Sequence, residues 1–295
     1  MPPPRPGRRT IVAAALAGVV ARPRLLAAAE PEAIDAHGHV FVKGLPMAID
    51  GRYRPNYDAS WETLLALAEK NGVGRAVLLQ PSFLGFDNRY LFDALRARPG
   101  RFRGVPWLSP STPIPPAAWD EMERIGVRGL RFPIHGLPTP QWTYYRDMLA
   151  EAKRRRWPIH LTVESKRLPE LLPFLLNAGH DVVVPHFGLF DRTLGPARDP
   201  GFKVLLENAP SRRLWMVMCG AYRVGPERAR SATQFLLAAF PPDRLMWGSD
   251  WPHTDTTLDR VTTYAQTLKS LEDWVPDKAA RRTILIETPA KLYGF

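Results

Sequence analysis

Short apolar runs recur along the chain, and longer segments with helical periodicity separate them. The runs span residues 33–41, 75–82, 102–110, 127–133, 157–165, 181–188, 213–220 and 244–250. Each run has the length of a buried strand. Apolar residues at helical spacing mark residues 61–70, 141–156, 169–177, 226–240 and 257–270, and a last helix is expected over 276–293. The pattern therefore predicts strands and helices in alternation.

Such alternation predicts parallel strands joined by right-handed helical crossovers. Eight strand–helix units in a chain of 295 residues predict an α/β fold of the (β/α)8 TIM-barrel type. An open doubly wound sheet is the alternative, but no glycine-rich phosphate-binding turn follows the first run. In a barrel of this kind the active site lies at the carboxyl ends of the strands.

The beginning of the chain does not follow this pattern and resembles an export signal. Arg8 and Arg9 precede an apolar stretch, and small residues at 27–29 offer a cleavage site. We therefore expect a twin-arginine-like signal peptide over residues 1–29, a barrel domain over residues 30–295, and a periplasmic location. The alternative is a basic tail that is not a functional signal, with the protein in the cytoplasm.

Charge and cysteine content narrow the class of partner. The formal net charge is +11, but residues 1–29 contain five arginines and no acidic residue, which leaves +6 for the rest. The dense basic run at 153–156 is interpreted as a solvated helix end, because cations suit the last turn of a helix. No aromatic residues interleave with basic ones as in a nucleic-acid site, so we expect a small-molecule substrate, no nucleic acid and no membrane span. The single cysteine, Cys219, excludes an internal disulfide, and the oligomeric state stays open.

Polar residues capable of chemistry stand at the ends of three predicted strands. His37 and His39 end the first strand, and residues two apart in a strand face the same way. His186 ends the sixth strand and Asp250 the eighth. One polar group would suffice to cap a strand, so three histidines and an aspartate at one barrel mouth indicate a catalytic site. Arg131 on the fourth strand and Ser82 after the second are expected near it.

Several motifs carry a resemblance to a known family. The segments "IDAHGHVF", "PHFG", "MWGSDWPHT" and the C-terminal "TPAKLYGF" resemble the amidohydrolase superfamily, in its amidohydrolase-related branch. Within that branch, "RYRPNYDAS", "LLQPSFLGFDN" and "GLRF" are similar to the 2-pyrone-4,6-dicarboxylate lactonases and related lactone hydrolases, over residues 33–295. The resemblance implies a TIM barrel that opens a lactone ring, which is an intramolecular ester.

The resemblance also implies roles for individual residues. Asp250 takes a proton from water as general base, while His37, His39 and His186 polarise the lactone carbonyl. The residues implied to bind a carboxylated substrate are Arg131, Arg223, Tyr53, Ser82 and Thr162. His253 is expected to lie near the substrate without a catalytic role.

Whether the protein needs a metal depends on which residue ends the fifth strand. Metal-dependent relatives bind Zn or Mn through the two histidines of the first strand, the aspartate of the eighth, and a histidine that ends the fifth. In "PIHLTVES" that last position falls on Thr162, a poor zinc ligand, and His160 lies one layer deeper. We therefore expect no metal cofactor. The alternative is a Zn- or Mn-dependent amidohydrolase or decarboxylase that binds the ion with His37, His39, Asp250 and His160.

The sequence also departs from the lactonase pattern. Pro185 and Leu189 replace an acidic and a cationic residue of the sixth strand, and Val217 replaces a lysine of the seventh, which weakens the case for a dicarboxylate substrate. Cys219 is interpreted as an inert buried thiol and not as a nucleophile. A binding protein that has lost the chemistry is a further alternative, but a binder would not need both a base and a histidine cluster.

Overall fold

Eight strands run parallel to one another, and they coincide with the eight apolar runs of the sequence. The computed structural model describes residues 1–2, 32–48, 53–254 and 262–295. The strands are β1 Ala33–Gly38, β2 Val73–Leu79, β3 Phe102–Val105, β4 Leu130–Pro133, β5 Ile159–Thr162, β6 Val182–Val184, β7 Leu214–Met218 and β8 Leu245–Trp247.

The strands form two parallel sheets that join into one barrel. The orders are β1-β2-β3 and β4-β5-β6-β7-β8. Between β3 and β4, the Arg128 amide donates to the Gly104 carbonyl at 2.9 Å. Between the end of β8 and β1, the Asp250 amide donates to the His37 carbonyl at 2.8 Å. Backbone hydrogen bonds thus close both seams, and the predicted (β/α)8 barrel is confirmed.

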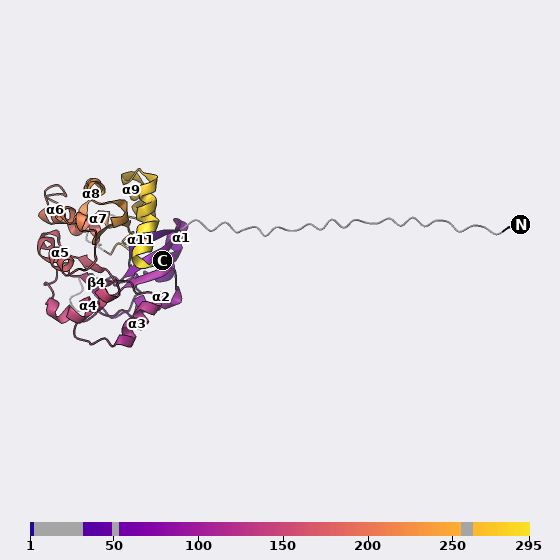
Figure 1. Ribbon diagram of the computed structural model, residues 1–295, viewed down its shortest axis with the longest axis horizontal. Coiled ribbons are helices and arrows are strands. Elements are labelled where there is room, and N and C mark those ends of the chain that lie inside the picture. The colour runs from indigo at the N-terminus through magenta and orange to yellow at the C-terminus, as the bar shows by residue number, and fades with distance from the viewer. Residues whose placement is uncertain (3–31, 49–52, 255–261) are drawn as a thin grey trace. The chain divides into compact units, whose positions relative to one another are not determined.

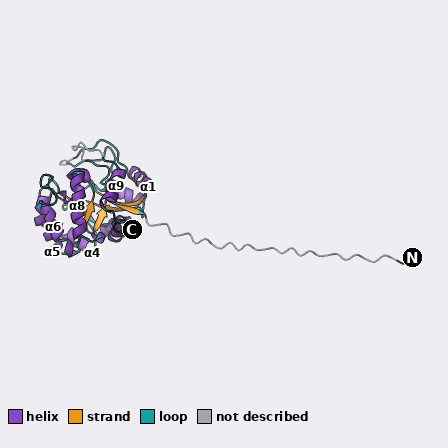
Figure 2. Cartoon of the chain, turned by 90° about the horizontal axis from the view of Figure 1, so that it is seen from above, coloured by secondary structure: helices purple, strands orange, loops and turns teal. Residues whose placement is uncertain are grey.

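Helices surround the strands, and long loops gather along one side of the barrel (Figures 1 and 2). The helices are α1 Trp61–Lys70, α2 Arg89–Ala97, α3 Pro116–Ile125, α4 Arg146–Arg154, α5 Leu168–Asn177, α6 Pro200–Glu207, α7 Ala221–Val224, α8 Pro226–Ala239, α9 Tyr264–Trp274, α10 Lys278–Arg282 and α11 Thr288–Tyr293. Among the described residues, no helix has the length and apolar character needed to cross a membrane.

Small aliphatic side chains fill the barrel interior. Val77, Val183 and Val217 come from three different strands, and each is fully buried. Tyr293 enters this inner cluster from the C-terminal helix. A larger cluster between strands and helices makes up the rest of the core. The interior is therefore packed, as in other (β/α)8 barrels, and the chemistry is left to the strand ends.

Two predicted helices differ in detail from the sequence pattern. Residues 142–145 form a 3-10 turn, so the helix expected from residue 141 begins at Arg146. The C-terminal helix contains a wider π-helical turn over Thr283–Glu287 between α10 and α11. Pro289 explains that turn, because proline has no amide hydrogen to donate to the carbonyl four residues earlier. A helix was also expected over residues 257–270, but its beginning lies partly outside the described residues; α9 begins at Tyr264.

The interpretation of the basic run at 153–156 as a solvated helix end is wrong for one residue. The Arg155 side chain is only 3% exposed and pairs with Glu151, Glu123 and Asp120. Three carboxylates therefore compensate the charge of a nearly buried guanidinium and connect α4 with α3.

The barrel unit spans Glu32–Phe295, close to the predicted domain of residues 30–295. The predicted signal peptide, residues 1–29, lies outside the described residues except for Met1 and Pro2.

Candidate active site

Asp250 lies just beyond β8, where the chain turns sharply against β1. Its side chain is fully buried, and its φ of +57° is in the left-handed region, which aspartate tolerates better than most residues. Gly248 makes the close approach possible, since a Cβ there would lie 2.6 Å from that of His37. The amide of Asp250 then donates to the His37 carbonyl. The sequence "WGSD" thus directs one carboxylate toward the strand-one histidines.

The predicted catalytic residues come together at the barrel mouth. Oδ1 of Asp250 lies 3.8 Å from Nε2 of His37 and 3.5 Å from Nε2 of His39. Oδ2 lies 3.8 Å from Nδ1 of His186. The ring of His37 packs edge-on against the other two, with centroids 5.0 Å from His39 and 4.8 Å from His186. The sequence prediction of one cluster from strands one, six and eight is therefore matched by the geometry.

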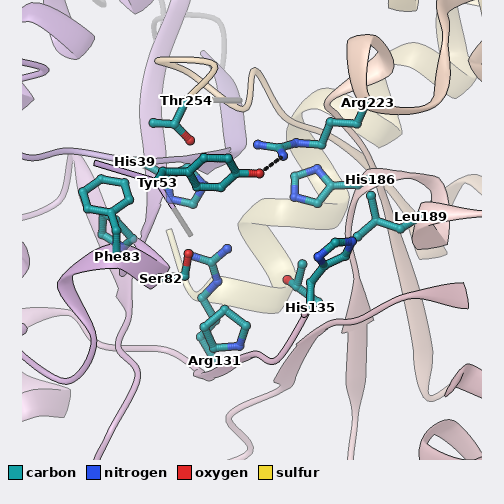
Figure 3. Close-up of a pocket in the computed structure, with 13 residues that line it drawn as sticks. His39, Tyr53, Ser82, Phe83, Arg131, His135, His186, Leu189, Arg223 and Thr254 are labelled. Atoms are coloured by element: carbon teal, nitrogen blue, oxygen red, sulfur yellow. Dashed lines mark hydrogen bonds between the residues drawn. The ribbon is translucent and has the colours of Figure 1, made fainter. Parts of the chain in front are cut away.

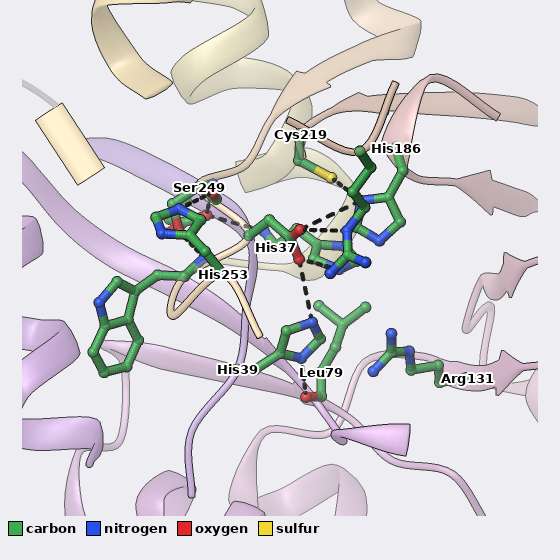
Figure 4. A network of polar contacts seen from close by, with 12 residues as sticks. His37, His39, Leu79, Arg131, His186, Cys219, Ser249 and His253 are labelled. Carbon is green, nitrogen blue, oxygen red and sulfur yellow. Dashed lines mark hydrogen bonds and ion pairs between the residues drawn. The ribbon is translucent and has the colours of Figure 1, made fainter. Parts of the chain in front are cut away.

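A backbone carbonyl fixes the proton of His39. Its Nδ1 lies 2.8 Å from the Leu79 carbonyl, which can only accept, so Nδ1 carries the hydrogen (Figure 4). Burial lowers the pKa of His39, and a neutral ring therefore presents a lone pair at Nε2 toward Asp250. Burial also lowers the pKa of His37 well below its usual value. Neither ring nitrogen of His37 has a hydrogen-bond partner among the described residues.

His186 is held by a thiol. Its Nδ1 lies 3.2 Å from Sγ of Cys219 (Figure 4). Burial raises the pKa of Cys219 well above its usual value, so the sulfur keeps its hydrogen and can donate it to Nδ1. Burial lowers the pKa of His186 to about 3, so the ring is neutral, and with the thiol donating to Nδ1 its own hydrogen lies on Nε2. Gly220 makes room for the cluster, because a Cβ there would lie 2.8 Å from Nδ1 of His186 and 2.9 Å from Oδ2 of Asp250.

Arg223 and Tyr222 hold the other oxygen of Asp250. Nε of Arg223 donates to Oδ2 at 2.9 Å, and the Tyr222 hydroxyl donates to the same atom at 2.7 Å. Burial alone would raise the pKa of Asp250, but the Arg223 charge and the contacts with His186, His39 and His37 together outweigh burial and hold the pKa well below its usual range. Oδ1 has no hydrogen-bond partner among the described residues and is left as the acceptor that faces the histidines.

The substrate-binding residues that the resemblance implies also lie together. A cavity of about 130 Å³ opens beside the cluster (Figure 3). Its lining includes His39, His186, Tyr53, Ser82, Thr162, Arg131 and Arg223. The Tyr53 hydroxyl accepts a hydrogen bond of 3.2 Å from Arg223. Burial lowers the pKa of Arg131 to about 10, which still leaves the guanidinium charged at neutral pH.

Three further residues of the site were not predicted from the sequence. His135 and Thr254 line the cavity (Figure 3), and Tyr222 bonds Asp250 directly. His135 stands two residues beyond the end of β4, where a polar residue of a barrel mouth is expected, and this position is its signal in the sequence. His253 lies against the Ser249 carbonyl, with Nε2 at 3.1 Å, and is absent from the cavity lining.

His160 lies away from the site, as its place in the strand indicates. It is fully buried, and its Nε2 is 3.1 Å from the Tyr293 hydroxyl. Thr162, two residues later, reaches the cavity instead. The structure thus assigns His160 to the packing between β5 and the C-terminal helix.

Asp35 braces the strand pair that carries the site. Its carboxylate accepts hydrogen bonds from the Ser249 amide at 2.9 Å, the Ser249 hydroxyl at 2.6 Å and the His37 amide at 3.1 Å. Burial raises the pKa of Asp35 to about 6. The Asp35 carboxylate therefore fixes the segment on each side of the β8–β1 seam, immediately beside His37 and Asp250.

Comparison with known proteins identifies the family of this chain. The model of the amidohydrolase family matches residues 34–295, which includes all four residues of the cluster. The chain belongs to the amidohydrolase family. Its (β/α)8 barrel is thereby the barrel of an amidohydrolase.

This amidohydrolase has relatives of known name along almost its whole length. It is 30% identical to a 4-sulfomuconolactone hydrolase of Rhizobium radiobacter, over 88% of this chain and 89% of the relative. It is 31% identical to a 2-pyrone-4,6-dicarboxylate hydrolase of Comamonas testosteroni, over 88% and 90%. A solved structure from Pseudomonas putida, described as a candidate 2-pyrone-4,6-dicarboxylic acid hydrolase, is 36% identical with a TM-score of 0.81, over 89% of this chain and 97% of that one.

Proposed function

We propose that this protein hydrolyses a lactone, with Asp250 as the general base. The observation that carries the proposal is that the two oxygens of the Asp250 carboxylate have different surroundings. Oδ2 is held by Arg223 and Tyr222, while Oδ1 faces the histidines and accepts no hydrogen bond from the described residues. A buried acceptor beside a cavity can receive a proton from an attacking water. The relatives named above are hydrolases of cyclic esters, which supports the same reaction class here.

The geometry divides the reaction among the residues. A water that donates to Asp250 Oδ1 and to the His39 lone pair, 3.5 Å apart, has its oxygen free to attack the lactone carbonyl. Asp250 takes the proton as the water oxygen bonds to the carbonyl carbon. The carbonyl oxygen gains negative charge, which the hydrogen of His186 stabilises. The ring C–O bond then breaks, and Asp250 returns the proton to the leaving oxygen.

This scheme changes the role of one histidine. The resemblance to the lactonases implies that His37, His39 and His186 all polarise the carbonyl. The Leu79 carbonyl holds the hydrogen of His39 on Nδ1, so a neutral His39 has no Nε2 hydrogen to donate. His39 therefore accepts from the water, and His186 remains the donor to the carbonyl oxygen. His37 acts in this scheme only through its edge-on packing against both rings.

The substrate is expected to carry a carboxylate. Arg131 and Arg223 both line the cavity, and guanidinium groups bind carboxylates through paired hydrogen bonds. Arg223 can reach such a group from its position beside Tyr53.

The same cluster also fits the ligand set of a divalent cation. His37, His39 and Asp250 offer buried ligand atoms within 4.8 Å of one another. Zn²⁺ or Mn²⁺ bound there would act as a Lewis acid on the carbonyl. We propose that catalysis does not need it, because Arg223 already neutralises the Asp250 charge and Thr162 stands where metal-dependent relatives have a fourth ligand. The scheme above uses residues of the chain alone.

A panel of lactones tests the reaction class. Purified protein is mixed with five- and six-membered lactones, with and without a carboxylate, and proton release is followed in weak buffer. We expect ring opening of at least one lactone, with the carboxylated members preferred. If every member is untouched while a matched amide or benzoate substrate reacts, the protein is an amide hydrolase or a decarboxylase.

Metal content is tested on the same preparation. The expected result is less than a tenth of an equivalent of Zn or Mn by elemental analysis and unchanged lactone turnover after dialysis against a chelator. One equivalent of metal whose removal abolishes turnover, with recovery on adding it back, would establish the metal-dependent alternative.

A further inference from the structure

The catalytic cavity adjoins a second, larger cavity with mostly apolar walls, here called the apolar lobe. Its volume is about 640 Å³. Its large apolar side chains are Met47, Leu84, Phe86, Trp107 and Leu137. Ser82, Pro133 and His135 line both the lobe and the catalytic cavity, so the two spaces share one wall.

The size of the catalytic cavity limits what it can hold. At about 130 Å³ it is close to the roughly 150 Å³ of an apolar cavity that accommodates benzene. A single lactone ring therefore occupies most of it. A sizeable substituent on that ring must therefore extend out of the catalytic cavity. The apolar lobe is adjacent, because Ser82 and Pro133 line both spaces.

Buried polar side chains hold the lobe open. Gln80 donates to the carbonyls of Gly85 at 3.2 Å and Asp87 at 2.8 Å, which fixes the loop that carries Phe86. Asn88 donates to the carbonyls of Phe86 and Trp107, each at 2.9 Å. The Phe86 and Trp107 rings then lie with centroids 4.6 Å apart. A preformed apolar surface loses little conformational entropy when a ligand binds.

The chemistry of the lobe favours an uncharged group. The carboxylate in its wall, Asp87, is paired with Arg89 at 2.6 Å. Phe86 remains 44% exposed, a large area for an aromatic ring at the edge of an active site. Leu189, in the catalytic cavity, stands where the related pyrone lactonases have a cationic residue, which also lowers the demand for a second anionic group.

We propose that the apolar lobe binds an alkyl or aryl substituent of the lactone, so that the substrate is an amphipathic lactone with its anionic group at Arg131 and Arg223. The inference rests on the proposed lactone hydrolysis and adds the substrate class. Such a substrate places the reacting ring beside Asp250 and its tail against Phe86 and Trp107.

A homologous series tests this proposal. Six-membered lactone carboxylates with n-alkyl substituents from methyl to hexyl are compared by kcat/KM. Each buried methylene should raise kcat/KM by about fourfold. Phe86→Asp and Met47→Asp, on two different walls, should flatten this rise while leaving the methyl compound within about threefold. Phe174→Asp is the matched control, because Phe174 is 45% exposed on α5 and should leave the rise intact.

The outcomes separate the two proposals. Hydrolysis of the methyl compound without any rise along the series would overturn the role of the lobe and leave lactone hydrolysis standing. If kcat/KM rises with chain length as steeply in both lobe variants as in wild type, the role of the lobe is also overturned. If no member of the series is hydrolysed, the proposed function fails and the substrate class fails with it.

Discussion

Asp250 stays charged although it is completely buried, and among its neighbours Arg223 contributes most to this. A buried carboxylate without a cation behaves as Asp35 does, whose pKa burial raises to about 6 despite its hydrogen bonds. Beside Arg223, Asp250 instead has a pKa well below its usual range. Such a carboxylate is a weak base, but it is ionised and can therefore accept a proton. Its conjugate acid is strong enough to protonate a leaving alkoxide. A substrate carboxylate that attracts Arg223 would raise the basicity of Asp250.

This contrast predicts the pH dependence of an Arg223→Gln variant. In wild type the Asp250 pKa is depressed, so the carboxylate persists as pH falls and the acid limb of kcat/KM lies below about pH 4. Without the guanidinium, burial dominates and the pKa rises, so the limb should move up toward the value of Asp35, about 6. The pH profile of kcat/KM measures it. Arg213 lies on the surface and is 51% exposed, so the control variant Arg213→Gln should leave the acid limb in place. A pH profile of Arg223→Gln identical to that of wild type would contradict the role of Arg223.

At the scale of elements, short polar anchors fix the loops that deliver the catalytic groups. Asp199 is the N-cap of α6 and accepts from the Phe202 amide at 2.7 Å. Its other oxygen accepts from the Ser165 hydroxyl and the Asp191 amide, each at 2.8 Å. One buried carboxylate thereby connects α6 with the segments that follow β5 and β6, near Thr162 and His186.

Replacing this anchor should destabilise the fold. Asp199→Ala removes three hydrogen bonds to a buried charged acceptor and should lower the free energy of unfolding by about 3 kcal/mol. Asp199→Asn keeps an oxygen at the cap and should lower it by only about 1 kcal/mol. Urea denaturation of the three proteins measures the difference. Equal losses for both variants would show that the hydrogen bonds of Asp199 do not stabilise the loops.

Many of the strands and the positions of their polar ends could be predicted from the sequence. The eight apolar runs located the strands, and histidine spacing on β1 placed His37 and His39 together. The burial of Arg155 could not be foreseen, because its three carboxylate partners come from α3 and α4 and meet it only in the folded chain. The same holds for Tyr222, whose bond to Asp250 depends on how the turn after β7 meets the end of β8.

At the scale of the whole molecule, barrel closure turns scattered strand ends into one site. His37, His186 and Asp250 are far apart in sequence and lie together because β8 closes on β1. The pattern of strands and helices predicted that closure. It did not predict the apolar lobe, because the lobe is lined by loops from four strands whose lengths and turns carry no periodic signal.

The location of the molecule in the cell is a separate prediction. If residues 1–29 are a twin-arginine signal, replacing both Arg8 and Arg9 by lysine should keep the protein in the cytoplasm of a bacterial host. Replacing Arg22 and Arg24 instead should not. Fractionation followed by immunoblotting gives the distribution, and an unchanged distribution for the Arg8/Arg9 variant would contradict the export signal.

The central claim is that Oδ1 of Asp250 receives the proton of the attacking water, and turnover by Asp250→Asn tests it most directly. The change is well tolerated in shape: the amide oxygen can accept from Arg223 and Tyr222, and the amide nitrogen can donate to the lone pair of His39. On a lactone that wild type opens, we predict that kcat falls at least 10³-fold while the substrate dissociation constant changes less than about threefold. A kcat within tenfold of wild type would contradict the role of Asp250 as the base.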